Sequence, residues 1–447
     1  MRIVLAGPDR EENLSLRYLA SSLAESGHHA VLVPFDGQED AAHVVAEAGH
    51  ADMVGLPMCF QVRAREFLDV ARALKAEDPS RVVIAGGHFA SCAAVPLLTS
   101  TPEIDLVAIH EGERTIVEIA DAVASGDLAG RAGRIPGIAI REGGEVRITG
   151  PRPALADLDR LPWPARSGPA RLLAGVPTAY LMGSRGCFGS CDYCCITTLH
   201  ALVPGPRFRQ RRPDRVADEM ASLYHDRGAR LFVFHDDNFL VPSERRNHER
   251  LDALDRALDV RGVRDIGLTL KCRPGDATRS VMERLRGMGL VRVFLGVESA
   301  TLAGLESLGR KQSAEDSERA LSLMEDLGIS AQFTVMTLHP EATIATIRSD
   351  VAFMRGHASS PLNWCRAEAY AGTPLERRMM EAGRARGSWL ARTYGIADPA
   401  ADLVSSVATR LFRDRCWSAG SLMERTIGTD HLAAVAREFY EGRDVRD

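Results

Sequence analysis

The segment TAYLMGSRGCFGSCDYCC, residues 178–195, is the most informative stretch of the sequence. It places Cys187, Cys191 and Cys194 in a C-x3-C-x2-C spacing on a glycine-rich loop directly after an apolar strand. Three thiols within eight residues converge only if the loop wraps around a bound group, and glycine permits such a tight path. Cys195 follows at once, but adjacent side chains point in divergent directions.

Three kinds of site use cysteines in this way. A zinc site needs a fourth ligand, for which Cys195 is the nearest choice, and usually a second pair further along the chain. A redox dithiol needs only a C-x2-C pair, which leaves Cys187 over. A [4Fe–4S] cluster is held by thiolates, and three of them leave one iron open to a substrate or cofactor. The spacing favours the cluster, with a structural metal site or spare thiols as the alternatives.

The region around this loop, residues 177–375, alternates between strands and helices. Strands are predicted at 178–186, 230–237, 266–273, 291–299, 330–338 and 363–370, and helices at 213–227, 243–260, 278–288, 313–327 and 341–357. Six such units predict a partial (β/α)6 barrel. In barrels of this kind the chemistry lies at the carboxyl ends of the strands.

Residues 1–130 form a separate alternating series. Apolar strands are predicted at 2–7, 29–35, 52–58, 81–87 and 104–113, with amphipathic helices between them. This pattern predicts an α/β domain with a doubly wound parallel sheet. Residues 131–176 combine a hairpin with a Gly-Gly turn and a proline-rich stretch, which predicts an ordered linker across the domain joint. Residues 376–447 are predicted to be a helical C-terminal region.

The composition limits the classes of function. The chain has 447 residues, 45% of them hydrophobic, a net charge of -5 and a pI near 6.3. This balance argues against general attraction to nucleic acid or to anionic membranes. The start of the chain is too acidic for a secretory signal, and no apolar run reaches the ~20 residues of a membrane span. We therefore expect a cytoplasmic protein, in which nine cysteines form no disulfide framework.

The cysteine triplet, with the aromatic Tyr193 before its last cysteine, resembles the signature of the radical S-adenosylmethionine (SAM) superfamily. The partial barrel with the motif after its first strand is similar to the fold of that family. The resemblance implies a [4Fe–4S] cluster whose open iron chelates SAM. An electron from a donor such as flavodoxin or ferredoxin then cleaves SAM to a 5′-deoxyadenosyl radical.

Further positions match the family's SAM-binding elements. After the second strand, Asp236, Asp237 and Asn238 stand where the family binds the amino group, although the commoner motif is Gly-Gly-Glu. An Asx-capped turn is the structural alternative. Lys271 and Arg273 end the third strand and match a pair for the SAM carboxylate. Their alternative is a solvated strand end.

Two more elements are matched in the same way. The GVES segment resembles the ribose-contacting element, which points to Glu298 and Ser299. Carboxylates suit ribose hydroxyls. Gly372, Thr373 and Pro374 resemble the last-strand element that lies along the adenine, although a Gly-Thr-Pro turn is common elsewhere.

The N-terminal domain resembles the cobalamin-binding domain of one subgroup of this superfamily. The resemblance rests on two segments at the carboxyl edge of the sheet, Gly86, Gly87 and His88, and Glu111, Gly112 and Glu113. Many cobalamin domains carry an Asp-x-His-x-x-Gly loop after the first strand, whereas residues 9–13 here read DREEN. This departure puts a histidine-ligated cobalt in doubt, and lone histidines such as His88 and His110 are more often structural.

The combined resemblance implies a cobalamin-dependent methyltransferase that acts on an unactivated carbon of a small molecule. One SAM supplies the methyl group through cobalamin, and a second yields the radical that removes a substrate hydrogen. Two alternatives remain open: a non-methylating radical reaction such as ring contraction, cyclisation or dehydrogenation, and a sensor without turnover. A sensor usually carries a docking or DNA-reading module, and residues 376–447 show no reading motif.

Overall fold

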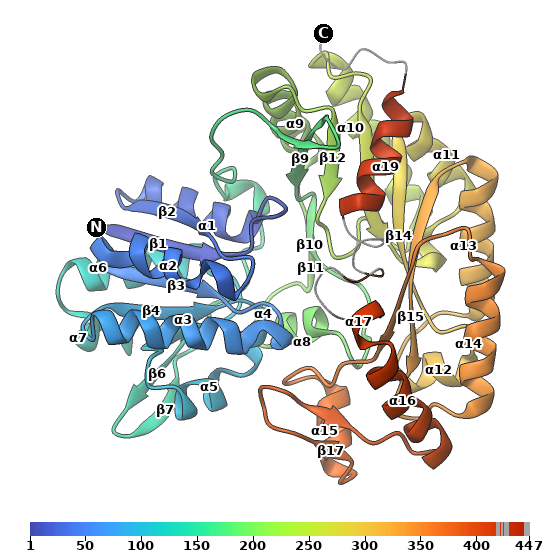
Figure 1. Cartoon of the computed structure of the whole chain (residues 1–447). Helices are drawn as coiled ribbons and strands as arrows, with labels where there is room; N and C mark the ends of the chain where they lie inside the picture. The colour runs from blue at the N-terminus through green and yellow to red at the C-terminus, as the bar shows by residue number, and fades with distance from the viewer. Residues whose placement is uncertain (417–420, 422, 424–428, 442–447) are drawn as a thin grey trace.

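The computed structural model describes residues 1–416, 421, 423 and 429–441. Two seven-stranded sheets lie side by side, one formed by the N-terminal third and one by the rest of the chain (Figure 1). The α/β class and the order of the two sheets, as predicted, are confirmed. Within the described residues, no helix combines the length and apolarity needed to cross a membrane.

The N-terminal sheet has the strand order β2-β1-β3-β4-β5-β6-β7. Its first five strands are parallel, as predicted, while β6 and β7 join antiparallel as a hairpin. Gly143 and Gly144 turn this hairpin with positive φ angles of 61° and 88°, a conformation that glycine adopts without strain. The strands are Arg2–Gly7, His29–Pro34, Met53–Pro57, Val82–Gly86, Leu106–Ala108, Ile138–Glu142 and Glu145–Ile148.

Helices cover both faces of this sheet. One face packs against α1 (Leu14–Glu25), α6 (Glu113–Ala124) and α7 (Leu128–Ala132). The other packs against α2 (Ala41–Glu47), α3 (Ala64–Glu77), α4 (His88–Cys92) and α5 (Ala94–Ser100). Because both faces are covered, the carboxyl edge of the strands is left for ligands.

The second sheet has the order β16-β15-β14-β13-β12-β9-β8. Six of its strands are parallel, and only β8 (Arg171–Leu173) is antiparallel. The parallel strands are β9 (Val176–Leu181), β12 (Leu231–Phe234), β13 (Gly267–Cys272), β14 (Leu290–Glu298), β15 (Ser330–Leu338) and β16 (Leu362–Arg366). This is the predicted partial barrel.

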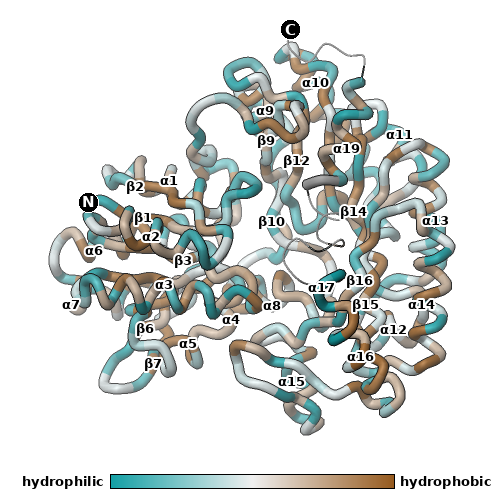
Figure 2. Tube along the Cα trace, viewed as in Figure 1, coloured by the Kyte–Doolittle hydropathy of each residue, from teal (hydrophilic) through white to brown (hydrophobic). Residues whose placement is uncertain are grey.

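The outer face of the barrel carries a ring of helices over the largest apolar core. These helices carry a mixture of polar and apolar residues (Figure 2), and their buried apolar residues pack against the strands. These helices are α9 (Pro213–Arg227), α10 (Glu244–Val260), α11 (Arg279–Gly287), α12 (Leu302–Ser307), α13 (Ala314–Leu327) and α14 (Ile344–Gly356). The short strands β10 (Ser184–Gly186) and β11 (Phe208–Gln210) and helix α8 (Cys195–Ala201) lie between the two sheets.

The C-terminal region is mainly helical, as the sequence predicts, but it also contains one short hairpin. A small hairpin, β17 (Ala385–Arg386) with β18 (Thr393–Tyr394), separates α15 (Pro374–Glu381) from α16 (Pro399–Leu411) and α17 (Arg413–Cys416). Helix α19 (Thr429–Tyr440) packs against the barrel strands, where Leu432 and Ala436 are buried. The rest of the predicted helical region, 417–420, 422, 424–428 and 442–447, lies outside the described residues.

The proline-rich stretch before β8 is ordered by buried ion pairs. Arg166 contacts Glu12 of the N-terminal part at 3.3 Å and Glu219 of α9 at 2.9 Å. Arg211 pairs with the other oxygen of Glu219. The stretch therefore bridges the two sheets, although the domain boundaries themselves remain a prediction.

Candidate functional site

The cysteine loop runs from β10 to α8 and is held from two sides. The Asp192 N–H donates to the carbonyl of Leu308 at 3.0 Å, and the Leu375 N–H donates to the carbonyl of Asp192 at 3.0 Å. Arg378 also pairs with the Asp192 carboxylate at 2.8 Å. The ends of α12 and α15 thus determine the path of the loop through contacts within the protein.

The thiols of this loop surround a glycine. A Cβ added at Gly189 would lie in van der Waals contact with the Cys187 sulfur at 3.5 Å and the Cys191 sulfur at 3.7 Å, so this glycine lies between the two thiols. Burial raises the pKa of Cys194 to about 11, against the opposing N–H groups of Ile196 and Thr197. A cluster must therefore displace protons when it binds.

The donor set fits an iron–sulfur cluster. In the part of the chain that the structure describes, no three His, Cys, Asp or Glu side chains gather around one ion position. A cluster distributes its thiolates over several irons and does not need such convergence. Cys195 packs instead against the core of the N-terminal sheet.

Arg310 is a residue of this site that the sequence did not reveal. Its Nη1 lies 3.4 Å from the Cys191 sulfur, and its Nη2 donates to the Gly296 carbonyl at 2.7 Å. Burial alone would lower the pKa of Arg310, but Tyr193 and Glu298 hold it above its ordinary value. Arg310 follows α12, far from the triplet in sequence, and its segment carries no motif that would have identified it.

Glu298 presents an unsatisfied carboxylate beside the cysteine loop. Burial raises its pKa, while Arg310 and a hydrogen bond from Tyr193 oppose that rise. Its Oε2 is buried and accepts no hydrogen bond in the protein, and its φ of 70° is strained for a residue other than glycine. A buried acceptor without a donor fits the hydroxyl groups of a bound ribose. The neighbouring Ser299 instead donates to Asp350 at 3.0 Å and stabilises the turn.

The structure separates the three polar residues after β12. Asp236 accepts from the Gly183 N–H at 2.8 Å and from the Ser184 hydroxyl, and is fully buried. Asn238 accepts from the Arg273 N–H at 3.0 Å and is also buried. Asp237 is exposed, and its charge acts on the thiols of the cysteine loop and on His88. Asp237 alone of the three is available to a ligand.

Arg273 follows the end of β13 and acts on the cysteine loop, whereas Lys271 lies within the strand. The positive charge of Arg273 acts on the Cys187 thiol, and its Nε is buried without a partner. Its Nη2 donates to the Lys311 carbonyl at 2.8 Å. An arginine with a free N–H group and a charge that acts on a cluster thiol suits a carboxylate bound next to the cluster.

The Gly372–Pro374 segment begins helix α15. The Thr373 hydroxyl accepts from the Glu376 N–H at 3.2 Å, and Pro374 occupies the first helical position, where proline is favoured. Gly372 has a φ of 76°, and a Cβ there would lie 3.3 Å from the Cβ of Cys92 in the N-terminal part. These contacts give the segment a capping and packing role, and its contact with adenine remains a prediction.

The Gly86–His88 segment ends β4 at the carboxyl edge of the N-terminal sheet. A Cβ at Gly87 would lie 2.7 Å from the Cys59 sulfur, so the glycine makes room for that side chain. His88 hydrogen-bonds with Cys59, which lowers the pKa of the thiol although burial opposes this. Phe60, 61% exposed, and Val62, 78% exposed, leave an apolar surface in the same loop. Such a surface at this edge fits a large, partly apolar cofactor.

The Glu111–Glu113 segment contacts the barrel rather than facing free space. Glu111 pairs with Arg185 at 3.1 Å and with Arg209 at 2.8 Å, and Glu113 pairs with Arg185. Burial would raise the pKa of Glu111, but the two arginines lower it to about 2. We call these four residues the interdomain clamp. Gly112 is the N-cap of α6.

A pair of histidines lies beside the interdomain clamp. His110, with a φ of 71°, contacts His200 of helix α8 through a hydrogen bond of 2.9 Å. Burial is the first cause that lowers the pKa of each imidazole to about 4. Both rings are therefore neutral near pH 7. Their hydrogen bond connects the loop after β5 of the N-terminal sheet to helix α8, which follows the cysteine loop.

Sequence comparisons match two families. The profile of the Radical SAM superfamily matches residues 181–354, and that of the B12 binding domain matches residues 3–120. An uncharacterized methyltransferase of Pyrococcus horikoshii is 27% identical over 81% of this chain and 77% of its own length. The hopanoid C-3 methylase of Methylococcus capsulatus is 25% identical over 73% and 61%.

An anaerobic magnesium-protoporphyrin IX monomethyl ester cyclase of Cereibacter sphaeroides is 24% identical over 61% of the chain, which spans only 44% of that enzyme. Two solved structures share the fold. The methyltransferase TsrM from Kitasatospora setae, with cobalamin and a [4Fe-4S] cluster bound, has a TM-score of 0.69 at 17% identity and covers 85% of this chain and 75% of its own. The radical enzyme OxsB with aqua-cobalamin has a TM-score of 0.72 at 16% identity and covers 93% and 67%.

Proposed function

Because this chain carries a B12-binding domain followed by a radical SAM domain, we propose that it is a cobalamin-dependent methyltransferase that adds a methyl group to an unactivated carbon. The substrate is a small molecule. The reaction also needs an electron donor such as flavodoxin or ferredoxin, and we place it in the reducing cytoplasm. The named methyltransferase relatives support this choice of reaction.

The observation that carries the proposal is the juxtaposition of the two carboxyl edges. Asp237 follows a barrel strand, yet its charge acts on both the Cys187 thiol and His88 of the N-terminal sheet. The interdomain clamp and the His110–His200 contact hold these edges together. Groups bound at the two edges would therefore meet in one place, as a transfer between two cofactors requires.

The cofactors supply the radical and the methyl group when they are bound, and the protein supplies binding and orientation. In the proposed arrangement Cys187, Cys191 and Cys194 hold the cluster. Arg273 binds the carboxylate of SAM, and Asp237 binds its amino group. Glu298, kept in position by Tyr193 and Arg310, accepts hydrogen bonds from the ribose.

The test follows the fate of SAM on anaerobically reconstituted protein. SAM with a deuterated methyl group should deliver CD3 to the product, and each product should be accompanied by one S-adenosylhomocysteine and one 5′-deoxyadenosine. The hydrogen lost from the substrate should appear in 5′-deoxyadenosine. Mass spectrometry of all three products measures this balance.

Other balances would identify the alternatives. 5′-Deoxyadenosine without S-adenosylhomocysteine would indicate ring contraction, cyclisation or dehydrogenation. The sequence similarity to a cyclase supports this second candidate function. Cobalamin binding with neither product would indicate a sensor and would contradict the proposed function.

A further inference from the structure

Lysine is rare in this chain, and one lysine is placed unusually. Of 55 Lys and Arg residues, only Lys75, Lys271 and Lys311 are lysines. Lys75 pairs with Asp105 at 2.8 Å, and Lys311 is exposed in a loop. Lys271 is also exposed, although it lies within β13 in the middle of the barrel sheet. An exposed ammonium at such a position needs a specific explanation.

The Lys271 side chain lies on the concave face of the barrel. Leu268, Leu270 and Cys272 of the same strand pack into the core beneath the outer helices. Because successive side chains of a strand alternate between faces, Lys271 points to the opposite side. Arg292 does the same on β14, since Val293 and Leu295, which alternate with it along the strand, belong to the outer core.

Four ionisable groups meet on this face, and we call Glu11, His235, Lys271 and Arg292 the concave charge cluster. Glu11 comes from the loop after β1, reaches across from the N-terminal sheet and pairs with His235 at 3.2 Å. A hydrogen bond from His235 is the first cause that lowers the Glu11 pKa, with Lys271 and Arg292 contributing to the same shift. One carboxylate therefore faces two permanent cations.

Lys271 is the less engaged of the two cations. Arg292 donates to Gln332 on β15. Within the described residues, the Lys271 ammonium has no hydrogen bond and no ion pair, and Glu11 influences it only from a distance. The ammonium is exposed on the concave face and no described protein group neutralises it by direct contact, so this position is suited to a negatively charged ligand.

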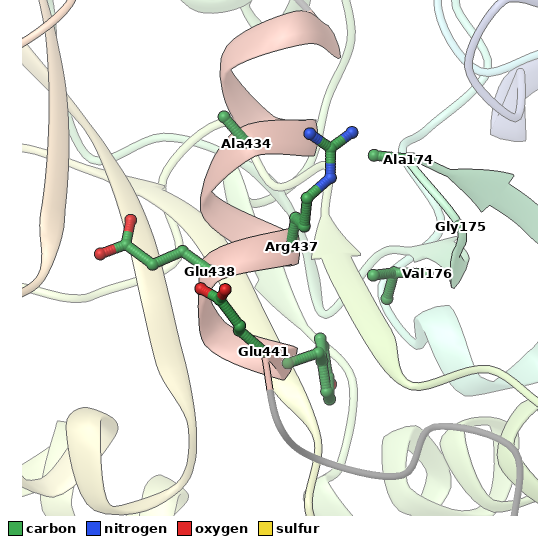
Figure 3. A pocket seen from close by; sticks show the side chains of 8 residues that line it. Ala174, Gly175, Val176, Ala434, Arg437, Glu438 and Glu441 are labelled. Atoms are coloured by element: carbon green, nitrogen blue, oxygen red, sulfur yellow. The ribbon is translucent and has the colours of Figure 1, made fainter.

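The barrel is closed at its other end. Leu432 and Ala436 of α19 are buried against Leu231 and Val291, and the Tyr440 hydroxyl donates to the Arg230 carbonyl at 2.7 Å. The pocket of about 370 Å³ beside Arg437 and Glu438 lies outside this seal, at the amino end of β9 (Figure 3). A ligand therefore approaches the concave charge cluster from the carboxyl edge, where the cysteine loop lies.

We propose that Lys271 binds an anionic group, a carboxylate or a phosphate, of the substrate itself. This inference rests on the proposed function for the identity of the ligand as the substrate. The charge of Arg273, two residues further on, acts on the Cys187 thiol and suits the SAM carboxylate, which leaves Lys271 for the substrate. Glu11 and His235 border the same position, so both domains contact the substrate. A compact, flexible ammonium accommodates either anion as a point charge.

The test measures access to the three lysines in the intact protein loaded with cluster, cobalamin and saturating SAM. Reductive dimethylation with formaldehyde and dimethylamine–borane, followed by peptide mass spectrometry, reports the modification rate of each lysine. Malonate and inorganic phosphate are the probes, and malonamide is the uncharged control. At about ten times its dissociation constant, a bound anion should slow modification of Lys271 about tenfold, while modification of Lys311 stays constant.

The outcomes distinguish this inference from its rivals. If neither anion slows modification of Lys271, the inference is wrong. If SAM alone already protects Lys271 while malonate adds nothing, the residue pairs with the cofactor, and the inference is again wrong. Protection by malonate but not by phosphate supports it and selects a carboxylate. Because the readout does not depend on methyl transfer, failure of the isotope experiment leaves this result intact.

Discussion

The Cys187–Cys194 loop and the His110–Glu113 loop occupy equivalent places and are used in opposite ways. The second follows β5 of the N-terminal sheet, and the first follows the short strand β10, which continues the chain beyond β9 of the barrel; each carries a short motif with glycine. The Cys187 and Cys191 sulfurs of the first loop flank Gly189, and the protein groups that contact the three thiols are N–H donors. The carboxylates of the second are committed to Arg185 and Arg209 across the domain joint.

This difference teaches that a motif at a strand end does not by itself identify a cofactor ligand. The deciding property is whether the polar atoms of the side chain already have hydrogen-bond partners within the protein. Asp236, Ser299 and Thr373 have hydrogen-bond partners among their own neighbours, whereas Glu298 Oε2 and Arg273 Nε are buried without one. Asp237 accepts from the Gly186 N–H at 3.0 Å but stays exposed. Buried polar atoms without partners are rare in proteins, so such atoms identify the ligand-facing groups.

The largest effect should follow from breaking the cysteine loop. Replacing Cys187, Cys191 or Cys194 with Ala removes a thiolate ligand, and we expect complete loss of the cluster and of 5′-deoxyadenosine formation. Iron content, visible absorbance and product analysis measure this loss. Cys195→Ala is the matched control and should retain the cluster. If Cys195→Ala alone lost it, the choice of ligands would be wrong.

Breaking the interdomain clamp should cost stability rather than the cluster. Arg185→Ala leaves Glu113 buried without its counter-charge and Glu111 with Arg209 alone, and we expect a loss of about 3–5 kcal/mol in the free energy of unfolding. Denaturant unfolding measures it, and iron content should stay near that of the wild type. Arg212→Ala, which removes an exposed pair, should cost less than about 1 kcal/mol. Equal losses in the two variants would show that the clamp does not hold the domains.

Removing the unsatisfied carboxylate should weaken SAM binding selectively. Glu298→Gln keeps the shape but removes the charge, and we expect a loss of about 1.5–3 kcal/mol, roughly a tenfold to hundredfold increase in the Kd for SAM. The affinity for methionine, which has no ribose, should not change. Ser299→Ala should affect stability but not SAM affinity. A parallel loss of methionine affinity would place Glu298 elsewhere in the site.

The smallest effect should come from the histidine pair. The pKa of each imidazole is about 4 in the folded protein, below the ordinary 6.5, so the folded state binds fewer protons between these values. Stability is then full above pH 6.5 and falls as the pH drops toward 4. Between pH 7 and 5.5 this amounts to about 1 kcal/mol per imidazole. Thermal unfolding of wild type and His200→Gln should show a steeper pH dependence for the wild type, and identical slopes would contradict the assignment.

Much of the fold could be predicted because it depends on local pattern. Apolar runs with helical or alternating spacing predicted the parallel strands of both sheets, and the Gly-Gly pair predicted the hairpin that holds Gly143 and Gly144. The β17–β18 hairpin was missed because each of its strands has only two residues. Arg310 and the clamp arginines were missed because their partners are distant in sequence.

The sequence by itself determined the cysteine triplet, the two α/β series and their order, because these follow from spacing and periodicity within short segments. Only the tertiary structure decided which motif residues face a ligand. Glu111 finds Arg209 across 98 positions of sequence, and Glu11 finds His235 across the domain joint. Such pairings depend on how the sheets pack against each other. That packing results from burial summed over many residues and leaves no local signature in the sequence.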